Sequence, residues 1–247
     1  MNVKGIILAA GRGSRMREFT DDRPKCLVEL HGQSLLDRQL TALREAGVQD
    51  VGIVTGYRRE LLMRPGVTEF HNDLWDQSNM VSSLARAVAW LEQHICIVSY
   101  SDIFYEPSAV AALISCQASL AITYDPNWLD IWKLRFDDPL SDAETFRLSS
   151  DGRMTEIGNK PRSLAEVEGQ YMGLLRFTPE GWREASRVRL KLSMDEIDRL
   201  QMTHLLQRII LAGNVPVIGV PYDGQWGEVD SPEDLYQYRQ GLDRPAS

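Results

Sequence analysis

The chain has 247 residues, of which 43% are hydrophobic and 25% charged, with a formal net charge of −8. This length suits one large α/β domain, and the apolar fraction is enough for a full core, which excludes an intrinsically disordered chain. The negative charge excludes general nucleic-acid binding, which needs a basic surface.

The first half of the chain alternates strands and helices. The apolar run Val3 to Ala10 ends in glycines, which predicts a buried parallel strand that enters a loop. Helical apolar spacing predicts a helix over Ser34 to Ala46, with Ser34 as its N-cap. The remaining elements expected up to about residue 123 are strands at 51–55, 67–70 and 95–100 and a helix at 79–92. This alternation predicts an α/β fold with a doubly wound, mostly parallel, Rossmann-like sheet.

The second half is less regular and predicts a small antiparallel lobe. Strands are expected at 120–124, 132–136, 147–149, 169–177 and 215–220, and helices at 179–187 and 203–212. Ser231 and Pro232 predict the cap and first residue of a final helix, and residues 243–247 an unstructured end. We therefore expect a single domain over 1–247, made of a half at about 1–123, a half at about 124–230, and a C-terminal helix and tail at 231–247.

Cysteine usage and the N-terminal segment indicate a cytoplasmic protein. Cys26, Cys96 and Cys116 are odd in number and widely spaced, which favours buried reduced thiols over disulfides. No cysteine or histidine pair has the spacing of a zinc site. Residues 1–4 run directly into a strand-like stretch, so we expect no signal peptide, and no apolar run is long enough to cross a bilayer.

A glycine loop follows the first strand, in the string LAAGRGSRM that begins at Leu8. Gly11 and Gly13 lack Cβ atoms, so the backbone N–H groups around them can approach phosphate oxygens. Arg15 and Lys25 add positive charge to the same neighbourhood. A nucleoside triphosphate is the natural partner of such a cluster.

Two other phosphate-binding loops do not fit this segment. The Walker loop needs Gly-Lys followed by Ser or Thr, which is absent downstream of Gly11. The dinucleotide loop needs a third glycine where Met16 stands, which argues against a dinucleotide-dependent oxidoreductase.

The string LAAGxGxRM, followed by Pro24-Lys25, resembles the signature of the nucleotidyltransferases that activate sugar phosphates and phosphocholine. The resemblance implies a nucleotidyltransferase fold in which the loop wraps the NTP phosphates, while Arg15 and Lys25 neutralise them and act in catalysis. The nucleotide-binding residues implied in this region are Leu8, Ala9, Ala10, Gly11, Gly13, Ser14, Arg15 and Lys25.

Two aspartates are candidate ligands of Mg²⁺. Asp102 follows the apolar run 95–98, and ligands of open parallel sheets bind at the carboxyl ends of strands. Two carboxylates can hold one Mg²⁺ while phosphate oxygens and water complete its coordination. The family resemblance implies one metal-binding Asp after the central strand and another before a late helix, which Asp102 and Asp230 match. Asp102 would also contact the nucleotide.

Other matches to the family concern the nucleobase and the acceptor. Asn79 and Ser83 match the segment that recognises the base, although simple capping of a helix also explains Asn79. Lys160, in Gly-Asn-Lys-Pro, matches the lysine that grips the acceptor phosphate and takes part in catalysis. Glu168 and Tyr171 lie in a stretch that resembles the strand closing the acceptor pocket.

The order and spacing of several polar and aromatic positions resemble bacterial phosphocholine cytidylyltransferases. Trp132 is the aromatic match, and an aromatic face near a carboxylate contributes about 0.5–2 kcal/mol to the binding of a cation. Core packing explains such a ring equally well. The sequence contains no complete aromatic cage, so phosphocholine, an aminophosphonate or another phospho-amino compound, and a sugar phosphate stay open as acceptors.

The resulting interpretation is a CTP-dependent cytidylyltransferase that joins CMP to a phosphorylated small molecule and releases pyrophosphate, without nucleic-acid or membrane partners. The acceptor oxygen is already anionic, so positioning and charge stabilisation would suffice. One alternative is a hexose-1-phosphate uridylyl- or thymidylyltransferase, whose base loop often carries a GTA-like segment absent here. Another is a non-catalytic nucleotide-sensing subunit, which we would expect to lose a metal-binding Asp or the loop arginine. A homodimer also stays open.

Overall fold

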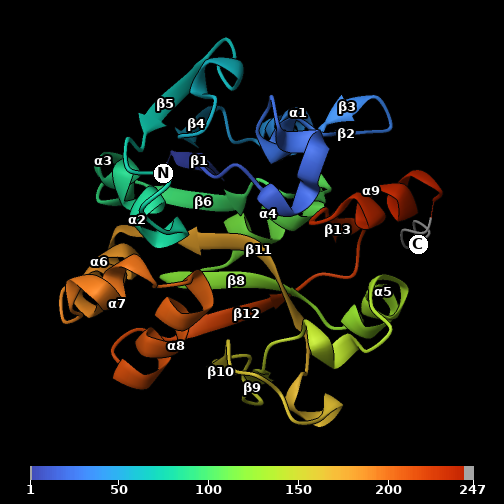
Figure 1. Ribbon diagram of the computed structural model, residues 1–247. Coiled ribbons are helices and arrows are strands. Elements are labelled where there is room, and N and C mark those ends of the chain that lie inside the picture. The colour runs from blue at the N-terminus through green and yellow to red at the C-terminus, as the bar shows by residue number, and fades with distance from the viewer. Residues whose placement is uncertain (1, 242–247) are drawn as a thin grey trace.

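The computed structural model describes residues 2–241, which are organised around a seven-stranded sheet (Figure 1). The strand order is β12-β8-β11-β6-β1-β4-β5, and all neighbours pair in parallel except β11, which is antiparallel to β6 and β8. The strands of this sheet are β1 (Val3–Ala9), β4 (Asp50–Thr55), β5 (Val67–His71), β6 (Ile95–Tyr100), β8 (Leu120–Asp125), β11 (Gln170–Phe177) and β12 (Val217–Pro221). The prediction of a mostly parallel α/β sheet is confirmed.

The centre of the sheet is apolar on both faces. Ile6 and Ile7 of β1 and Ile97 and Val98 of β6 are fully buried, as expected for parallel strands that helices cover on both sides. Helix α4 packs on β6, β8 and β11, α6 on β11, and α8 on β12. The α-helices are α1 (Leu35–Glu45), α2 (Met80–Leu84), α3 (Val88–Leu91), α4 (Pro107–Ser115), α5 (Trp128–Arg135), α6 (Pro179–Arg189), α7 (Met194–Asp198), α8 (Met202–Ala212) and α9 (Pro232–Arg239).

Three two-stranded sheets accompany the main one. They pair β2 (Glu29–Leu30) with β3 (Gln33–Ser34), β7 (Ile103–Tyr105) with β13 (Trp226–Glu228), and β9 (Phe146–Leu148) with β10 (Met154–Ile157). The short 3₁₀ helices are η1 (Ser14–Thr20), η2 (Lys25–Leu27), η3 (Arg59–Leu61), η4 (Ala85–Ala87), η5 (Pro139–Ser141) and η6 (Leu164–Glu166). The pair β7–β13 matters most for the site, because it brings the residues after β6 beside the residues before α9.

The prediction of a strand at 132–136 is wrong, because this segment forms the second half of α5 and the cap that follows it. Trp128, Ile131 and Trp132 are its buried residues, and their spacing of three and four is helical. The β-propensity of the aromatic residues is outweighed by this packing. The helix expected at 79–92 is also interrupted, since η4 separates α2 from α3.

Several local predictions are confirmed. The Ser34 side chain accepts from the Asp37 N–H at the start of α1, and Ser231 forms a capping box with Asp234 at the start of α9. Cys26 and Cys96 are buried free thiols, whereas the free thiol of Cys116 is partly exposed. Within residues 2–241, no helix is long and apolar enough to cross a membrane. The expectation for residues 243–247 lies outside the described residues.

Candidate active site

The glycine loop leaves the end of β1 and turns back towards Lys25. Gly13 has φ 75°, in the left-handed region, and its carbonyl accepts from the Met16 N–H at 3.0 Å. A Cβ placed on Gly13 would lie 2.5 Å from Cβ of Lys25. Glycine is therefore required here both for its backbone conformation and for the close approach of the Lys25 side chain.

We expect Gly13→Ala to weaken nucleotide binding more than its backbone strain alone would explain. The strain costs about 1–2 kcal/mol, and the contact with Lys25 adds to it by displacing that side chain. Gly32→Ala is the matched control, because Gly32 has φ 76° but a Cβ placed on it would meet nothing within 4 Å. Thermal unfolding and CTP titration of both variants measure the difference, and equal CTP affinities would contradict the requirement for close approach.

Lys25 lies between the two predicted metal-binding aspartates. Its side chain is buried, and its ammonium donates to Oδ2 of Asp102 at 2.9 Å and to Oδ1 of Asp230. Burial alone would lower the pKa of Lys25, but the charges of Asp102 and Asp230 outweigh burial and raise it. Arg15 approaches the same Asp230 oxygen, with its Nη2 3.0 Å away. The structure thus brings together four residues that the sequence singled out separately.

Three carboxylates meet at this point. Oxygens of Asp102, Glu228 and Asp230 all lie within 4.8 Å of one another. Burial, followed by the charges of Asp230 and Asp102, raises the pKa of Glu228 to about 8. Burial would also raise the pKa of Asp230, but the charges of Lys25, Arg15 and Arg135 together outweigh burial and hold that pKa below its ordinary value. Oδ1 of Asp102 is buried without a hydrogen-bond partner in the described structure. Such an all-oxygen group suits a hard divalent cation.

Sequence reasoning missed Glu228 as a site residue, although a signal existed. Glu228 ends β13 two residues before Asp230, and residues two apart in extended chain share a face. It also missed Arg135 of α5, which contacts both Glu228 and Asp234. Nothing in the local sequence around Arg135 indicated these contacts. The strand predicted at 132–136 gave no reason to expect them.

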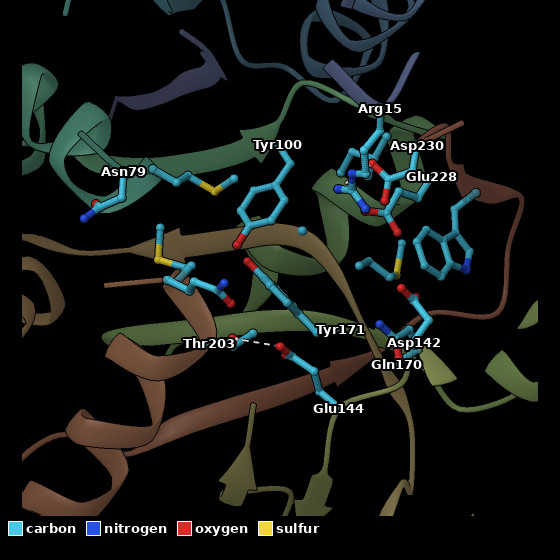
Figure 2. Close-up of a pocket in the computed structure, with 17 residues that line it drawn as sticks. Arg15, Asn79, Tyr100, Asp142, Glu144, Gln170, Tyr171, Thr203, Glu228 and Asp230 are labelled. Atoms are coloured by element: carbon cyan, nitrogen blue, oxygen red, sulfur yellow. Dashed lines mark hydrogen bonds and ion pairs between the residues drawn. The ribbon is translucent and has the colours of Figure 1, made fainter. Parts of the chain in front are cut away.

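A cleft of about 510 Å³ opens beside the carboxylates. In Figure 2, Arg15, Glu228 and Asp230 gather at one end, while Tyr100 and Tyr171 project between that end and Thr203. Acidic and polar side chains from separate elements form other parts of its wall, including Asp142 and Glu144 from the loop before β9, Gln170 from β11, and Asn79 at the start of α2. The cleft is therefore built from both halves of the chain.

Of the two residues expected to recognise the base, Asn79 is the N-cap of α2, whereas Ser83 lies within α2 and outside the described lining of the cleft. Asn79 lines the cleft, while its Oδ1 accepts from the Ser82 N–H and its Nδ2 donates to the Ile197 carbonyl. Ser83 is buried and accepts from Nδ2 of Asn72 at 2.9 Å. Asn79 thus caps the helix and borders the cleft, which makes the two interpretations compatible.

The residues expected to bind the acceptor are dispersed. Tyr171 lines the cleft, whereas Trp132, Lys160 and Glu168 lie outside its described lining. Trp132 is 1% exposed and its Nε1 donates to Asp142 at 3.2 Å. The Lys160 ammonium donates to the Ser141 carbonyl at 2.6 Å, and the Glu168 carboxylate accepts from the Leu148 N–H at 2.8 Å. These contacts support the loop around 138–148, which carries Asp142 and Glu144.

Residues 5–130 match the family model described as the MobA-like NTP transferase domain, which is more than half of the chain. The chain belongs to the MobA-like NTP transferase family. A similar protein is the CTP:phosphoglutamine cytidylyltransferase of Campylobacter jejuni, which is 34% identical over an alignment of 249 residues. The alignment covers 94% of this chain and 98% of that protein. This NTP transferase is therefore a nucleotidyltransferase by family, as the loop resemblance implied.

Two solved structures have the same fold as this NTP transferase. The inositol-1-phosphate CTP transferase of T. maritima has a TM-score of 0.76 at 21% identity, covering 97% of this chain and 94% of that one. The CTP:phosphocholine cytidylyltransferase of Streptococcus pneumoniae has a TM-score of 0.70 at 20% identity, covering 98% and 100%. At these identities the likeness shows the fold alone.

Proposed function

We propose that this chain is a CTP-dependent cytidylyltransferase that transfers CMP to a phosphorylated small molecule carrying an amino group, with release of pyrophosphate. The observation that carries the proposal is the position of Lys25 between Asp102 and Asp230, at the glycine loop and beside the cleft. The name of the Campylobacter jejuni relative supports CTP as the donor and a phosphorylated amino compound as the acceptor. Residues at about 1–123 would bind mainly the nucleotide, and residues at about 124–230 mainly the acceptor.

The residues of the site fit a bound Mg²⁺. Asp102 and Asp230 would hold it, with Glu228 close by, and the unpartnered Oδ1 of Asp102 is an acceptor free to take part. When bound, the metal would supply positive charge at the α-phosphate. Its oxygen-only donor set is the kind that Mg²⁺ takes from carboxylates and phosphates.

The remaining chemistry belongs to the chain's own residues. Backbone N–H groups of the glycine loop, together with Arg15 and Lys25, would hold the β- and γ-phosphates and stabilise pyrophosphate as it leaves. The phosphate oxygen of the acceptor attacks the α-phosphorus in line, the bond from that phosphorus to the bridging oxygen breaks, and its electrons leave with pyrophosphate. No protein base is needed, because the attacking oxygen is already anionic.

The acceptor end of the cleft favours a group with positive charge. Asp142 and Glu144 line it, and Glu144 has Thr203 Oγ1 at 3.4 Å as its described hydrogen-bond partner. Burial raises the pKa of Glu144, so a nearby cation would stabilise its ionised form. A primary ammonium supplies both charge and N–H donors to such carboxylates, whereas a sugar hydroxyl supplies no charge.

We expect Glu144→Gln to raise the KM for an amino-bearing acceptor about 10- to 100-fold, since a hydrogen bond to a charged group contributes about 1.5–3 kcal/mol. The KM for CTP should change little, because Glu144 and Arg15 lie at different ends of the cleft (Figure 2). Glu92→Gln is the control, as Glu92 is exposed and lies outside the cleft lining. Steady-state kinetics with both substrates measure the effect, and an equal rise in both KM values would contradict the assignment.

A pyrophosphate-release assay tests the function itself. Each of ATP, CTP, GTP, UTP and dTTP is combined with glutamine phosphate, phosphocholine, 2-aminoethylphosphonate and common hexose 1-phosphates, and products are identified by mass spectrometry. Turnover of CTP with an amino-bearing acceptor is the expected result. Turnover of UTP or dTTP with a hexose 1-phosphate would instead favour a sugar-phosphate enzyme. Nucleotide binding without turnover across the panel would favour a sensing subunit.

A further inference from the structure

Arg135 is a buried cation beside the carboxylate cluster of Asp102, Glu228 and Asp230. It is the last residue of α5, and its side chain is only 2% exposed. The guanidinium carbon lies 4.9 Å from the centroid of the Trp132 ring and 5.1 Å from that of Phe136. Two aromatic faces therefore hold the planar guanidinium in place.

Arg135 contacts three acidic residues at the end of β13 and before and within α9, namely Glu228, Asp230 and Asp234. Its Nη1 lies 3.2 Å from Oε2 of Glu228 and its Nη2 4.0 Å from Oδ2 of Asp230. Its Nε donates to Oδ1 of Asp234 at 2.7 Å, and its Nη2 donates to the other oxygen at 3.3 Å. Such a two-point pair fixes the orientation of both partners.

Asp234 connects Arg135 to the backbone at Asp230 through hydrogen bonds. Its Oδ2 accepts the N–H groups of Asp230 and Ser231, at 3.0 and 2.9 Å, and the Ser231 hydroxyl at 3.0 Å. The carboxylate is buried, so these hydrogen bonds replace its contacts with water. Arg135 thereby acts on Asp230 twice, through space on its carboxylate and through Asp234 on its backbone.

The location of Arg135 distinguishes it from the other cations of the site. Arg15 lines the cleft with a side chain that is 69% exposed, and the Lys25 side chain packs against Gly13 of the glycine loop. Arg135 lies outside the cleft lining and stays paired behind the carboxylates. A guanidinium also keeps its proton at all ordinary pH values. It is thus a permanent positive charge beside Glu228 and Asp234.

We propose that Arg135 is a positioning residue that presets Glu228 and Asp230 for a divalent cation, with Trp132 as its aromatic support. This inference rests on the proposed function in one respect, which is that the bound cation would then contact a nucleotide. It gives Trp132 an indirect role, through Arg135, in place of direct contact with an acceptor. Residues that hold metal ligands in position typically contribute about 10- to 100-fold to metal affinity. Loss of the two-point pair of the Arg135 guanidinium should therefore lower divalent-cation affinity measurably even without substrate.

The test compares Arg135→Lys with the wild-type chain by isothermal titration of Mn²⁺ and Mg²⁺ in the absence of nucleotide, together with thermal unfolding. We expect divalent affinity to fall about 10- to 100-fold, since lysine keeps a charge but lacks the planar fork. Arg187→Lys is the matched control, because Arg187 makes a similar two-point pair with Glu184 outside the cleft lining. Should Arg135→Lys fail to fold, Asp234→Asn replaces it, with a smaller expected loss.

Two outcomes separate this inference from the proposed function. Unchanged divalent affinity in a folded variant would overturn the positioning role, whatever the enzyme's turnover. Reduced divalent affinity of the variant, alongside a wild-type chain that fails to use CTP, would support Arg135 and overturn the cytidylyltransferase. With active enzyme, the metal concentration for half-maximal rate should rise while the KM for the acceptor stays constant.

Discussion

Replacement of Asp102 by asparagine is expected to lower kcat about 10³-fold or more, which corresponds to about 4 kcal/mol in the activation barrier. Asparagine retains an oxygen that can accept from Lys25, but it removes one of the charges that would hold the metal against the α-phosphate. The fold should tolerate the change. Asp102 lies within 4.8 Å of two other carboxylates, so neutralising it relieves repulsion between them, while Lys25 keeps a hydrogen-bond acceptor and loses one negative partner.

Single-turnover release of pyrophosphate measures the chemical step of this variant, and thermal unfolding measures its stability. Asp223→Asn is the matched control, because Asp223 is exposed and lies outside the cleft lining. Near-wild-type turnover by Asp102→Asn would contradict the assignment of Asp102 as a metal ligand. A large fall in the unfolding temperature would show that its loss acts through folding.

Replacement of Lys25 by methionine is expected to destabilise the metal-free chain by about 3 kcal/mol, since loss of one partner leaves buried charges without compensation. For a chain of this size, that corresponds to a fall of about 6–12 °C in the unfolding temperature. Asp102 and Asp230 lose their shared ammonium, although Arg15 stays near Asp230. Activity should fall about 10²- to 10³-fold, because a positive group at the leaving pyrophosphate is removed.

The same variant distinguishes two causes of its lower stability, which are repulsion between the carboxylates and lost packing of the Lys25 side chain. In the wild-type structure Lys25 lies between the carboxylates proposed to bind the metal, so a divalent cation has to compete with an internal one. Millimolar Mg²⁺ should therefore raise the unfolding temperature of Lys25→Met more than that of the wild-type chain. Lys133→Met, on the exposed face of α5, controls for a lost surface charge. Equal stabilisation by Mg²⁺ in all three proteins would contradict this explanation.

Local patterns in the sequence were sufficient for most of the fold. The continuous apolar runs of β1 and β6, the cap at Ser34 and the capping residue Ser231 each fix an element through contacts within a few neighbours. Prediction failed at 132–136, where a strand was expected and the segment forms the end of α5. The burial that decides for a helix there comes from contacts of Trp132 with Trp226, whose ring centroids lie 6.3 Å apart. Neighbours along the chain contain no information about such a contact.

The sequence by itself identified the candidate residues of the site: a glycine loop with Arg15 and Lys25, and aspartates placed at the end of a central strand and before a late helix. These are properties of residue type and local order, which the chain carries without its fold. The tertiary structure alone decided that Lys25 lies between Asp102 and Asp230, because the pairing of β7 with β13 brings those segments together. It also decided that Arg135 pairs with Glu228 and Asp234 while the Trp132 ring lies against its guanidinium. Distances between distant segments depend on the packing of the whole sheet, which no local pattern encodes.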